Sequence, residues 1–242
     1  CDLGRLNSGV TYYVKVDAYN YANLVASSDV INFRADVKMS DAYTEICGNG
    51  GYCNSPLYIR YNSNLFVVYR NNNGYKAIYN GIYTDSYFRS YSCCNQGYCN
   101  YGGTNFVNGQ IFSEALAPFL SSLSNYKNKL ILTEWNTGVY SDVSSRKSTS
   151  YVGLLDYKEY ENTQSKIWMY SSAVGKYFWL ASPHSYSSGS YANVMAALYN
   201  GSTFTSSGFS INSSHGVRPV VVFKGDIVFT SGNGTLESPY VV

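Results

Sequence analysis

The chain has 242 residues, of which 45% are hydrophobic and 13% are charged. Its 17 basic and 15 acidic residues nearly cancel, so the chain lacks the strong field that attracts polyanions, and we expect no nucleic-acid partner. No apolar run is long enough to cross a bilayer, which argues against direct membrane insertion of this segment. A chain of this length can bury roughly 70% of its unfolded surface, so we expect a sizeable core.

Tyrosine is unusually abundant, with 27 residues, and aromatic residues make up 17% of the chain. Buried phenol hydroxyls need hydrogen-bond partners, so this many tyrosines suits strands and wet contact surfaces better than a core alone. We expect such an uncharged, tyrosine-rich chain outside the cell, either secreted or displayed on the cell surface.

All six cysteines lie at or before position 99. The tight stretches CGNGGYC and CCNQGYC favour two short-range disulfides, from Cys47 to Cys53 and from Cys94 to Cys99, although sequence alone does not fix the connectivity. A zinc site would normally use CxxC spacing with nearby histidines, and both histidines lie far downstream. We therefore expect disulfides, no metal and no cofactor.

Residues 1–37 show strand periodicity. Polar and apolar side chains alternate between Tyr12 and Asp17, and a second strand is predicted at Asp29–Arg34. The stretch TYYVKVDAYN resembles the last strands of a fibronectin type III domain. The resemblance implies that residues 1–37 form a partial fibronectin type III-like strand pair, followed by a second domain at 38–242.

Strands and a hairpin are predicted early in the second domain. Leu57–Tyr61, Leu65–Arg70 and Tyr75–Tyr79 are rich in aromatic and branched residues, and NNNG lies between the last two as a hairpin turn. The stretch KLILTEWNTG predicts a further strand that ends in a turn.

Two helices are predicted by different signals. Four apolar residues recur at helical spacing in residues 110–126, where Pro118 must lie in a first turn or kink the helix. Asp156 can cap a second helix that begins at Tyr157, because Glu159 occupies the third helical position, as in a capping box.

The stretch from 177 to 217 contains no Asp, Glu, Lys or Arg. Apolar strand-like sequences, KYFWLASP and GVRPVVVF, lie at its two ends. A disordered segment is not expected to return into such a strand, so we expect residues 182–215 to be a held surface.

Three ordered motifs, YVGLLDYKEY, YFWLASP and GVRPVVVFKGDIVFTSGNGTLESPYVV, resemble the C-terminal module of a family of bacterial secreted and pilin-associated proteins common in gut Firmicutes. That module is similar to the bacterial form of the C-type lectin fold, which formylglycine-generating enzymes and the variable proteins of diversity-generating retroelements share. The resemblance implies an α+β fold for residues 38–242, with antiparallel strands, two short helices and a long loop-rich C-terminal segment.

The same resemblance implies that Trp179, Arg218 and Pro219 are scaffold and that residues 182–215 form the exposed face. We expect Arg218 to make a structural ion pair or to clamp backbone carbonyls. Pro219 cannot donate to a β-ladder, so it is expected at a bulge or an edge.

Enzymatic activity and calcium-dependent binding are both disfavoured. Formylglycine-generating relatives use cysteines in their C-terminal half, and this chain has none after Cys99. Neither histidine has a carboxylate nearby in sequence, so no catalytic constellation is predicted and we expect no enzyme. Calcium-binding lectins place a proline between carboxylate or amide side chains, whereas Pro183 lies between Ser182 and His184.

Calcium-free recognition by residues 182–215 fits the composition best. Tyrosine supplies rigid contact area, while Ser, Gly and Asn supply adaptable hydrogen bonds, as in antibody loops. The predicted ligand-binding residues are His184, Tyr186, Ser188, Tyr191, Asn193, Tyr199, Asn200, Phe204, Ser207, Phe209, Asn212 and His215. We predict an extracellular, surface-displayed module that binds a cell-surface protein or glycan. The alternative is a structural subunit of a pilus or surface fibre, whose tyrosine-rich face packs against a neighbour by self-association.

Residues 182–215 also fit diversification by a retroelement. Randomising both adenines of an AAC or AAT codon never produces Lys, Glu, Gln, Met or Trp, and only Met195 in this stretch falls outside the reachable set. A strand-loop segment rich in Ser and Tyr can show the same composition by chance, so both explanations stay open.

Overall fold

The computed structural model describes residues 9–21, 23–88, 106–185 and 193–242. Of these residues, 43% lie in strands and 21% are helical. The protein is therefore mostly β, and the predicted α+β class is wrong. The helices are short connections between strands, and the stretch predicted as a long C-terminal loop contributes strands instead. Ser, Thr and Tyr accept extended backbone readily when neighbouring apolar strands offer a ladder.

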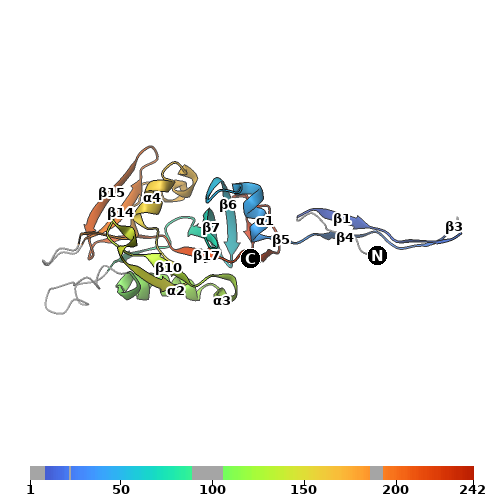
Figure 1. The fold of residues 1–242 in the computed structure, drawn as a ribbon, viewed down its shortest axis with the longest axis horizontal. Coiled ribbons are helices and arrows are strands. Elements are labelled where there is room, and N and C mark those ends of the chain that lie inside the picture. Colours follow the sequence, from blue (N-terminus) through green and yellow to red (C-terminus); the bar gives the residue numbers. More distant parts are fainter. Residues whose placement is uncertain (1–8, 22, 89–105, 186–192) are drawn as a thin grey trace.

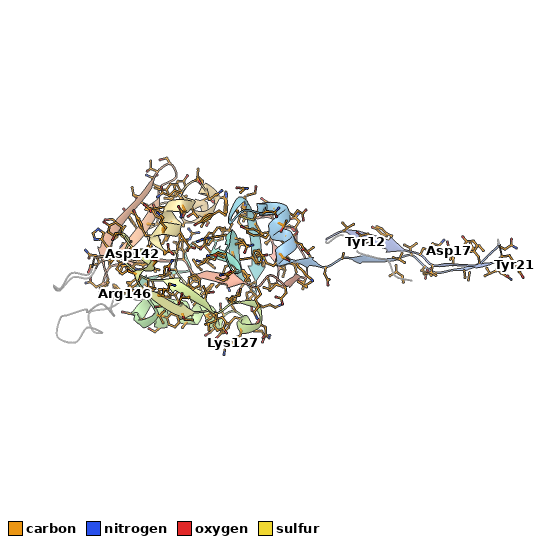
Figure 2. The ribbon with its side chains drawn as sticks, in the orientation of Figure 1. Tyr12, Asp17, Tyr21, Lys127, Asp142 and Arg146 are labelled. Carbon is orange, nitrogen blue, oxygen red and sulfur yellow. A yellow bond between two sulfur atoms is a disulfide. The ribbon has the colours of Figure 1, made fainter. Side chains whose placement is uncertain are left out.

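A two-stranded antiparallel ribbon near the N-terminal end projects from the rest of the molecule (Figure 1). It pairs β1 (Thr11–Val14) with β4 (Ile31–Arg34) and, further out, β2 (Asp17–Asn20) with β3 (Asn23–Ser27). The strand predicted at Asp29–Arg34 is thus confirmed as β4. Side chains project from the outer part of the ribbon, among them those of Asp17 and Tyr21 (Figure 2). Even apolar ones are open, since Tyr13 is 72% and Val25 is 61% exposed.

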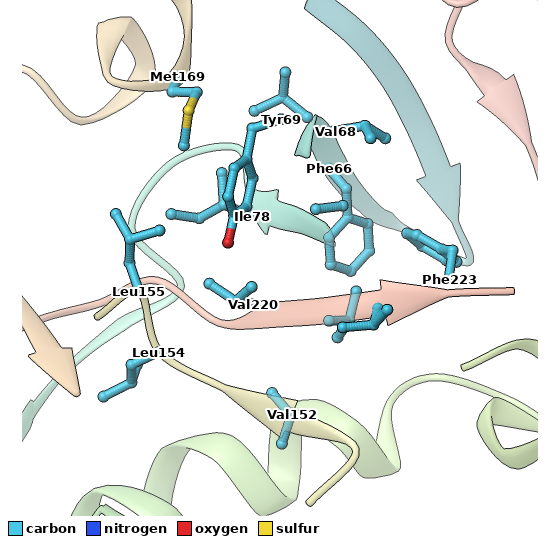
Figure 3. Packing of buried hydrophobic residues seen from close by; sticks show 14 of the residues in the cluster. Phe66, Val68, Tyr69, Ile78, Val152, Leu154, Leu155, Met169, Val220 and Phe223 are labelled. Carbon is cyan, nitrogen blue, oxygen red and sulfur yellow. The ribbon is translucent and has the colours of Figure 1, made fainter. Parts of the chain in front are cut away.

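A six-stranded sheet forms one half of the body. Its order is β12 (Val152–Gly153), β17 (Val220–Phe223), β8 (Tyr75–Tyr79), β7 (Asn64–Asn71), β6 (Tyr52–Tyr61) and β19 (Tyr240–Val241). The strands predicted between residues 57 and 79 are confirmed as β6, β7 and β8. Phe66, Ile78 and Val220 are fully buried in the hydrophobic cluster around this sheet (Figure 3). The helix α1 (Met39–Cys47) packs against β6.

A five-stranded sheet forms the other half. Its order is β15 (Phe204–Ser210), β14 (Asn193–Tyr199), β13 (Phe178–Ser185), β16 (Ser214–Val217) and β9 (Thr84–Tyr87). The β13–β16 pair is parallel and the other pairs are antiparallel. Most of the described residues between 182 and 215 belong to these strands. The described part of the stretch is therefore ordered, as predicted, but it is ordered as strands and not as a loop.

One pair of chain segments runs through both sheets and joins them. β8 and β17 pair in the six-stranded sheet, and their continuations β9 and β16 pair in the five-stranded sheet. The fully buried Arg218 lies at this joint, where its Nε donates to the Gly81 carbonyl at 3.0 Å and its Nη2 donates to the carbonyls of Tyr79 and Met169 at 3.2 and 2.6 Å. The expected carbonyl clamp is confirmed. Pro219 lies between β16 and β17, outside both ladders, where its missing N–H costs nothing.

Short elements complete the body. They are α2 (Ala117–Ser121), α3 (Tyr126–Lys129), α4 (Tyr157–Thr163), the ribbon of β10 (Thr133–Asn136) with β11 (Lys147–Ser150), the pair of β5 (Val37–Lys38) with β18 (Val228–Phe229), and 3-10 turns at Phe106–Asn108, Val143–Ser145, Ile167–Met169 and Ser171–Ala173. The strand predicted in KLILTEWNTG is confirmed as β10.

Both predicted helices are present, but each is shorter or less regular than an ideal helix. The first contains a π-helical turn, Phe112–Leu116, before α2, and Pro118 lies in the first turn of α2, where no N–H is required. The second is α4. Its cap is confirmed, because the Asp156 carboxylate accepts a hydrogen bond from the Glu159 N–H at 2.8 Å.

A disulfide links Cys47, at the end of α1, to Cys53 in β6. This confirms the first predicted pair, whereas Cys94 and Cys99 lie outside the described residues. Closing so short a loop stabilises the fold by about 2 kcal/mol in the chain-entropy model.

Candidate functional site

The predicted ligand-binding residues are spread over the five-stranded sheet. One face of the sheet packs against α4 and is called the helix face; the opposite one is called the far face. His184, Tyr199 and Phe204 lie on the helix face, Ser207, Phe209 and His215 on the far face, Asn193 at the start of β14, and Asn200 and Asn212 in turns. Tyr186, Ser188 and Tyr191 lie outside the described residues.

Six rings form a continuous row on the helix face, called the ring row. In order, they are Tyr199, Phe204, Tyr160, Tyr157, Tyr140 and His184, with successive centroids 4.6, 6.3, 6.1, 5.4 and 5.2 Å apart. The inner end is buried, since Tyr199 is 6% and Tyr160 only 1% exposed. The outer end, made by Tyr140, Tyr157 and His184, is open to solvent, with Tyr140 40% exposed.

The outer end of the ring row is held in place by backbone contacts. The ring of Tyr140 stacks on that of His184 at an interplanar angle of 12°. The Tyr140 N–H donates to the Pro183 carbonyl at 2.9 Å, which fastens the loop after β10 to β13. The Tyr157 N–H, at the start of α4, donates to the Ser182 hydroxyl at 3.0 Å. These bonds fasten the loop that carries Tyr140 and the start of α4 to β13, and so limit the entropy lost when a ligand binds.

Glycine at 208 permits the close approach of β15 to His184. A Cβ at this position would lie 2.5 Å from Cγ of His184, which is closer than real side chains approach. Because side chains alternate along a strand, Ser206 and Ser210 lie on the same face as Gly208. The outer end of the ring row therefore borders a strand of small hydroxyl residues.

The inner end of the ring row is a rigid support. The Tyr160 hydroxyl donates to the Thr205 carbonyl at 2.9 Å and so ties α4 to β15. Burial raises the pKa of Tyr160 to about 12, so this phenol keeps its proton at neutral pH. Tyr199 packs inside the fold against Phe204, and its hydroxyl donates to the Gly201 carbonyl at 2.7 Å.

The far face carries a second aromatic group, called the His215 cluster. It consists of His215 with Phe209, Trp179 and Tyr177, whose centroids lie 4.4, 4.7 and 5.7 Å from the imidazole. Nε2 of His215 is buried without a hydrogen-bond partner. Burial lowers the pKa of His215, against an opposing effect of Asp85. The arrangement favours packing by the neutral imidazole over acid–base chemistry.

The amide side chains have local roles in turns. Oδ1 of Asn200 accepts bonds from the N–H groups of Ser202 and Thr203 at 3.0 and 2.8 Å, which shapes the turn between β14 and β15. Asn212 accepts a bond from the Ser210 hydroxyl. The turn at Asn200 lies at the opposite end of the β14–β15 hairpin from Ser210, so the structure does not gather the predicted residues into one patch.

Two residues of the outer end were missed by sequence reasoning. Tyr140 and Tyr157 lie outside residues 182–215 and reach the sheet only through the loop after β10 and through α4. The only sequence signal for these two residues was the large number of tyrosines in the chain, and a composition does not indicate which tyrosines lie at a site.

Neither a metal centre nor a membrane span is found in the described part of the chain. Within those residues, no group of three or more His, Cys, Asp or Glu side chains could hold a metal ion. No helix among them is long and apolar enough to cross a membrane. What the outer end of the ring row offers is stacking and hydrogen bonding.

Comparisons with family models, with curated proteins and with solved structures find no match to this chain. The resemblances to a fibronectin type III segment and to the secreted, pilin-associated family therefore stay predictions. The function is argued below from the residues alone.

Proposed function

We propose that this chain is an extracellular, surface-displayed module that binds a cell-surface protein or glycan through the outer end of the ring row. The observation that carries the proposal is the stacked, solvent-open pair of Tyr140 and His184, held on β13 beside α4. Flat aromatic faces pack on the apolar face of a sugar ring or on a ligand side chain. The Ser206 and Ser210 hydroxyls of β15 supply adaptable hydrogen bonds beside them.

The proposed location outside the cell rests on two features. The disulfide between Cys47 and Cys53 is typical of oxidising compartments. The stretch from 177 to 217, which supplies His184 and the serines of β15, has no ionisable side chain other than tyrosine and histidine. The exposed charges nearest in sequence to the outer end are Asp142 and Lys158, which are of opposite sign. We therefore expect recognition to depend mainly on packing and hydrogen bonds and to change little with salt.

The proposal is tested by binding of the labelled protein to a glycan array and to intact cells. We expect Tyr140→Ala combined with His184→Ala to reduce binding at least tenfold, because both stacking faces are lost, while the melting temperature changes by less than about 4 °C. Tyr13→Ala is the control, since it removes an exposed tyrosine from the distant β1. Unchanged binding of the double variant would rule out the ring row as the ligand site.

A second candidate, a structural subunit of a pilus or surface fibre, is favoured by a different observation. The projecting ribbon exposes apolar side chains, among them Tyr13, Val25 and Ile31. At the other end of the body, the described residues leave one edge of β15 without a paired strand. Exposed apolar strands and open edges promote association between chains. Light scattering of the same samples separates the two functions, because oligomers that grow with concentration and that Tyr13→Ala weakens would favour the fibre.

Diversification of residues 182–215 by a retroelement belongs to the binding proposal. The positions of β15 that border the outer end, Ser206, Gly208 and Ser210, all fall in the set that adenine-targeted change can reach. Tyr140 and Tyr157 lie outside the diversified stretch, so their identity would stay constant while residues of the neighbouring β15 vary.

A further inference from the structure

A polar cavity lies between the β7–β8 turn and the ribbon of β10 and β11, apart from the residues of the ring row. Its volume is ≈ 520 Å³, and its lining includes Arg70, Lys76, Asn72, Asn136, Lys147 and Ile131. Sites for small molecules usually measure roughly 300–1,000 Å³. The cavity is thus large enough for one sugar residue.

The cations of the cavity are anchored by a buried acid. Oε1 of Glu159 accepts bonds from Nη1 of Arg70 at 3.0 Å and from Nζ of Lys76 at 2.6 Å, and the Tyr69 hydroxyl donates to Oε2 at 3.2 Å. The Glu159 side chain is only 4% exposed, whereas those of Lys76 and Arg70 are 12% and 28% exposed. One carboxylate thus holds two cations in fixed positions and leaves their remaining N–H groups for a ligand.

The third cation sits at the rim. Lys147 pairs with Glu134 at 2.7 Å, but the two side chains are 51% and 57% exposed. A pair this open contributes little to stability and is easily exchanged for a ligand group. The surface that a ligand would meet therefore presents three cations and one carboxylate.

Buried carboxylates behind the lining limit how much negative charge the cavity accepts. Besides Glu159, Asp156 is 4% exposed and accepts a bond from Nδ2 of Asn136 at 3.1 Å. Three carboxylates then face the three cations, and two of them, Glu159 and Asp156, are buried and cannot move away from a ligand with two negative charges. A single negative charge suits the site better than a phosphate or sulfate dianion.

The rest of the lining favours a hydroxylated ring. The side chains of Asn72 and Asn136 offer both donors and acceptors, and Ile131 and Val222 provide an apolar floor. We propose that this cavity binds the carboxylate-bearing sugar residue of an acidic glycan, with its carboxylate on Arg70, Lys76 and Lys147. This second site is independent of the proposed function of the ring row.

The test is titration of the intact chain with methyl glucuronide, followed by nuclear magnetic resonance of the backbone amides. We expect saturable shifts in residues 72–76 and 131–136, with binding at least tenfold tighter than that of methyl glucoside and tighter than that of inorganic phosphate. Lys147→Gln should weaken binding about three- to fivefold, the loss expected for one exposed charge contact. Lys158→Gln is the matched control, because Lys158 is an exposed lysine on α4 that does not line the cavity.

Three results would overturn the proposal. They are the absence of saturable shifts in these residues, equal affinity for methyl glucoside or for phosphate, and unchanged affinity of the Lys147→Gln variant. None of these results depends on Tyr140 or His184. The cavity proposal can therefore fail while the ring-row proposal stands, and the reverse is also possible.

Discussion

Two strands of the body, β17 in the six-stranded sheet and β15 in the five-stranded sheet, have very different sequences and different degrees of burial. In the six-stranded sheet, β17 consists of four buried residues, Val220–Phe223. In the five-stranded sheet, β15 has the sequence FTSSGFS and none of its residues is fully buried. The first kind of strand is stabilised by its own apolar side chains. The second is stabilised mainly by its neighbours, because it pairs along its whole length with the apolar β14 and is tied to α4 through Tyr160.

This difference identifies where each sheet is vulnerable. The six-stranded sheet depends on side-chain packing around residues such as Phe66 and Ile78, which are fully buried. In the five-stranded sheet, β13 and β14 also contribute buried side chains such as Trp179 and Val194, and it is the edge strand β15 that depends on pairing. Both sheets share the joint at Arg218, where β16 continues into β17. Loss of the joint affects both sheets at once, so it should cost the most.

The largest expected effect is that of Arg218→Met. The change removes the Arg218 donors of the Gly81 and Met169 carbonyls, and it leaves the Tyr79 carbonyl with the Gly81 N–H as its donor. We expect the free energy of unfolding to fall by about 3 to 5 kcal/mol, measured by urea denaturation. Arg60→Met, at an exposed position of β6, is the control and should change it by less than about 0.5 kcal/mol. Equal effects of the two changes would show that the joint is not held by Arg218.

A pair of substitutions tests the contrast between the sheets directly. Ile78→Ala in β8 removes a fully buried side chain and should cost about 3 kcal/mol. Thr205→Ala in β15 removes an exposed side chain. The bond to Tyr160 is made by the backbone carbonyl of Thr205 and is kept, so the change should cost less than about 0.5 kcal/mol. Thermal or urea unfolding of both variants measures the difference. A large loss at Thr205 would mean that β15 is stabilised by its own side chains after all.

The smallest effect is a pH dependence from the His215 cluster. Burial holds the folded pKa of His215 below its unfolded value of about 6.5. As the pH falls below that value, the unfolded chain takes up a proton that the folded chain resists, so stability declines toward acid pH. We expect His215→Phe to flatten this decline between about pH 7 and pH 5 in urea unfolding. Phe209→Leu, which alters the same cluster without removing a titratable group, is the control and should keep the slope.

Much of the six-stranded sheet could be predicted from sequence, because runs such as LFVVY and VVVF are rich in branched and aromatic residues, which favour buried strands. The capped start of α4 was equally readable, since Asp156 and Glu159 act within one turn. The β15 strand could not be predicted, because FTSSGFS has no strong preference until β14 lies beside it. The α+β class failed for the same reason, since a stretch expected to be loop became strand.

The candidate site was predicted in part. His184 lies at the outer end of the ring row, but its partners Tyr140 and Tyr157 come from distant segments that no local pattern connects to it. Tyr199, which was predicted to meet a ligand, is buried, and Phe204 is partly buried, because alternation along β14 and β15 turns both toward α4.

The sequence by itself determined the apolar strands and favoured the Cys47 to Cys53 disulfide, because each depends on chemistry within a short segment. It singled out Arg218 but left open whether that side chain makes an ion pair or clamps carbonyls. Only the tertiary structure decided that β14, β15 and β16 form strands, which face each aromatic ring occupies, and that Arg70, Lys76 and Lys147 share a cavity. Those outcomes depend on which strands pair across the chain, and pairing is set by long-range burial that no local stretch encodes.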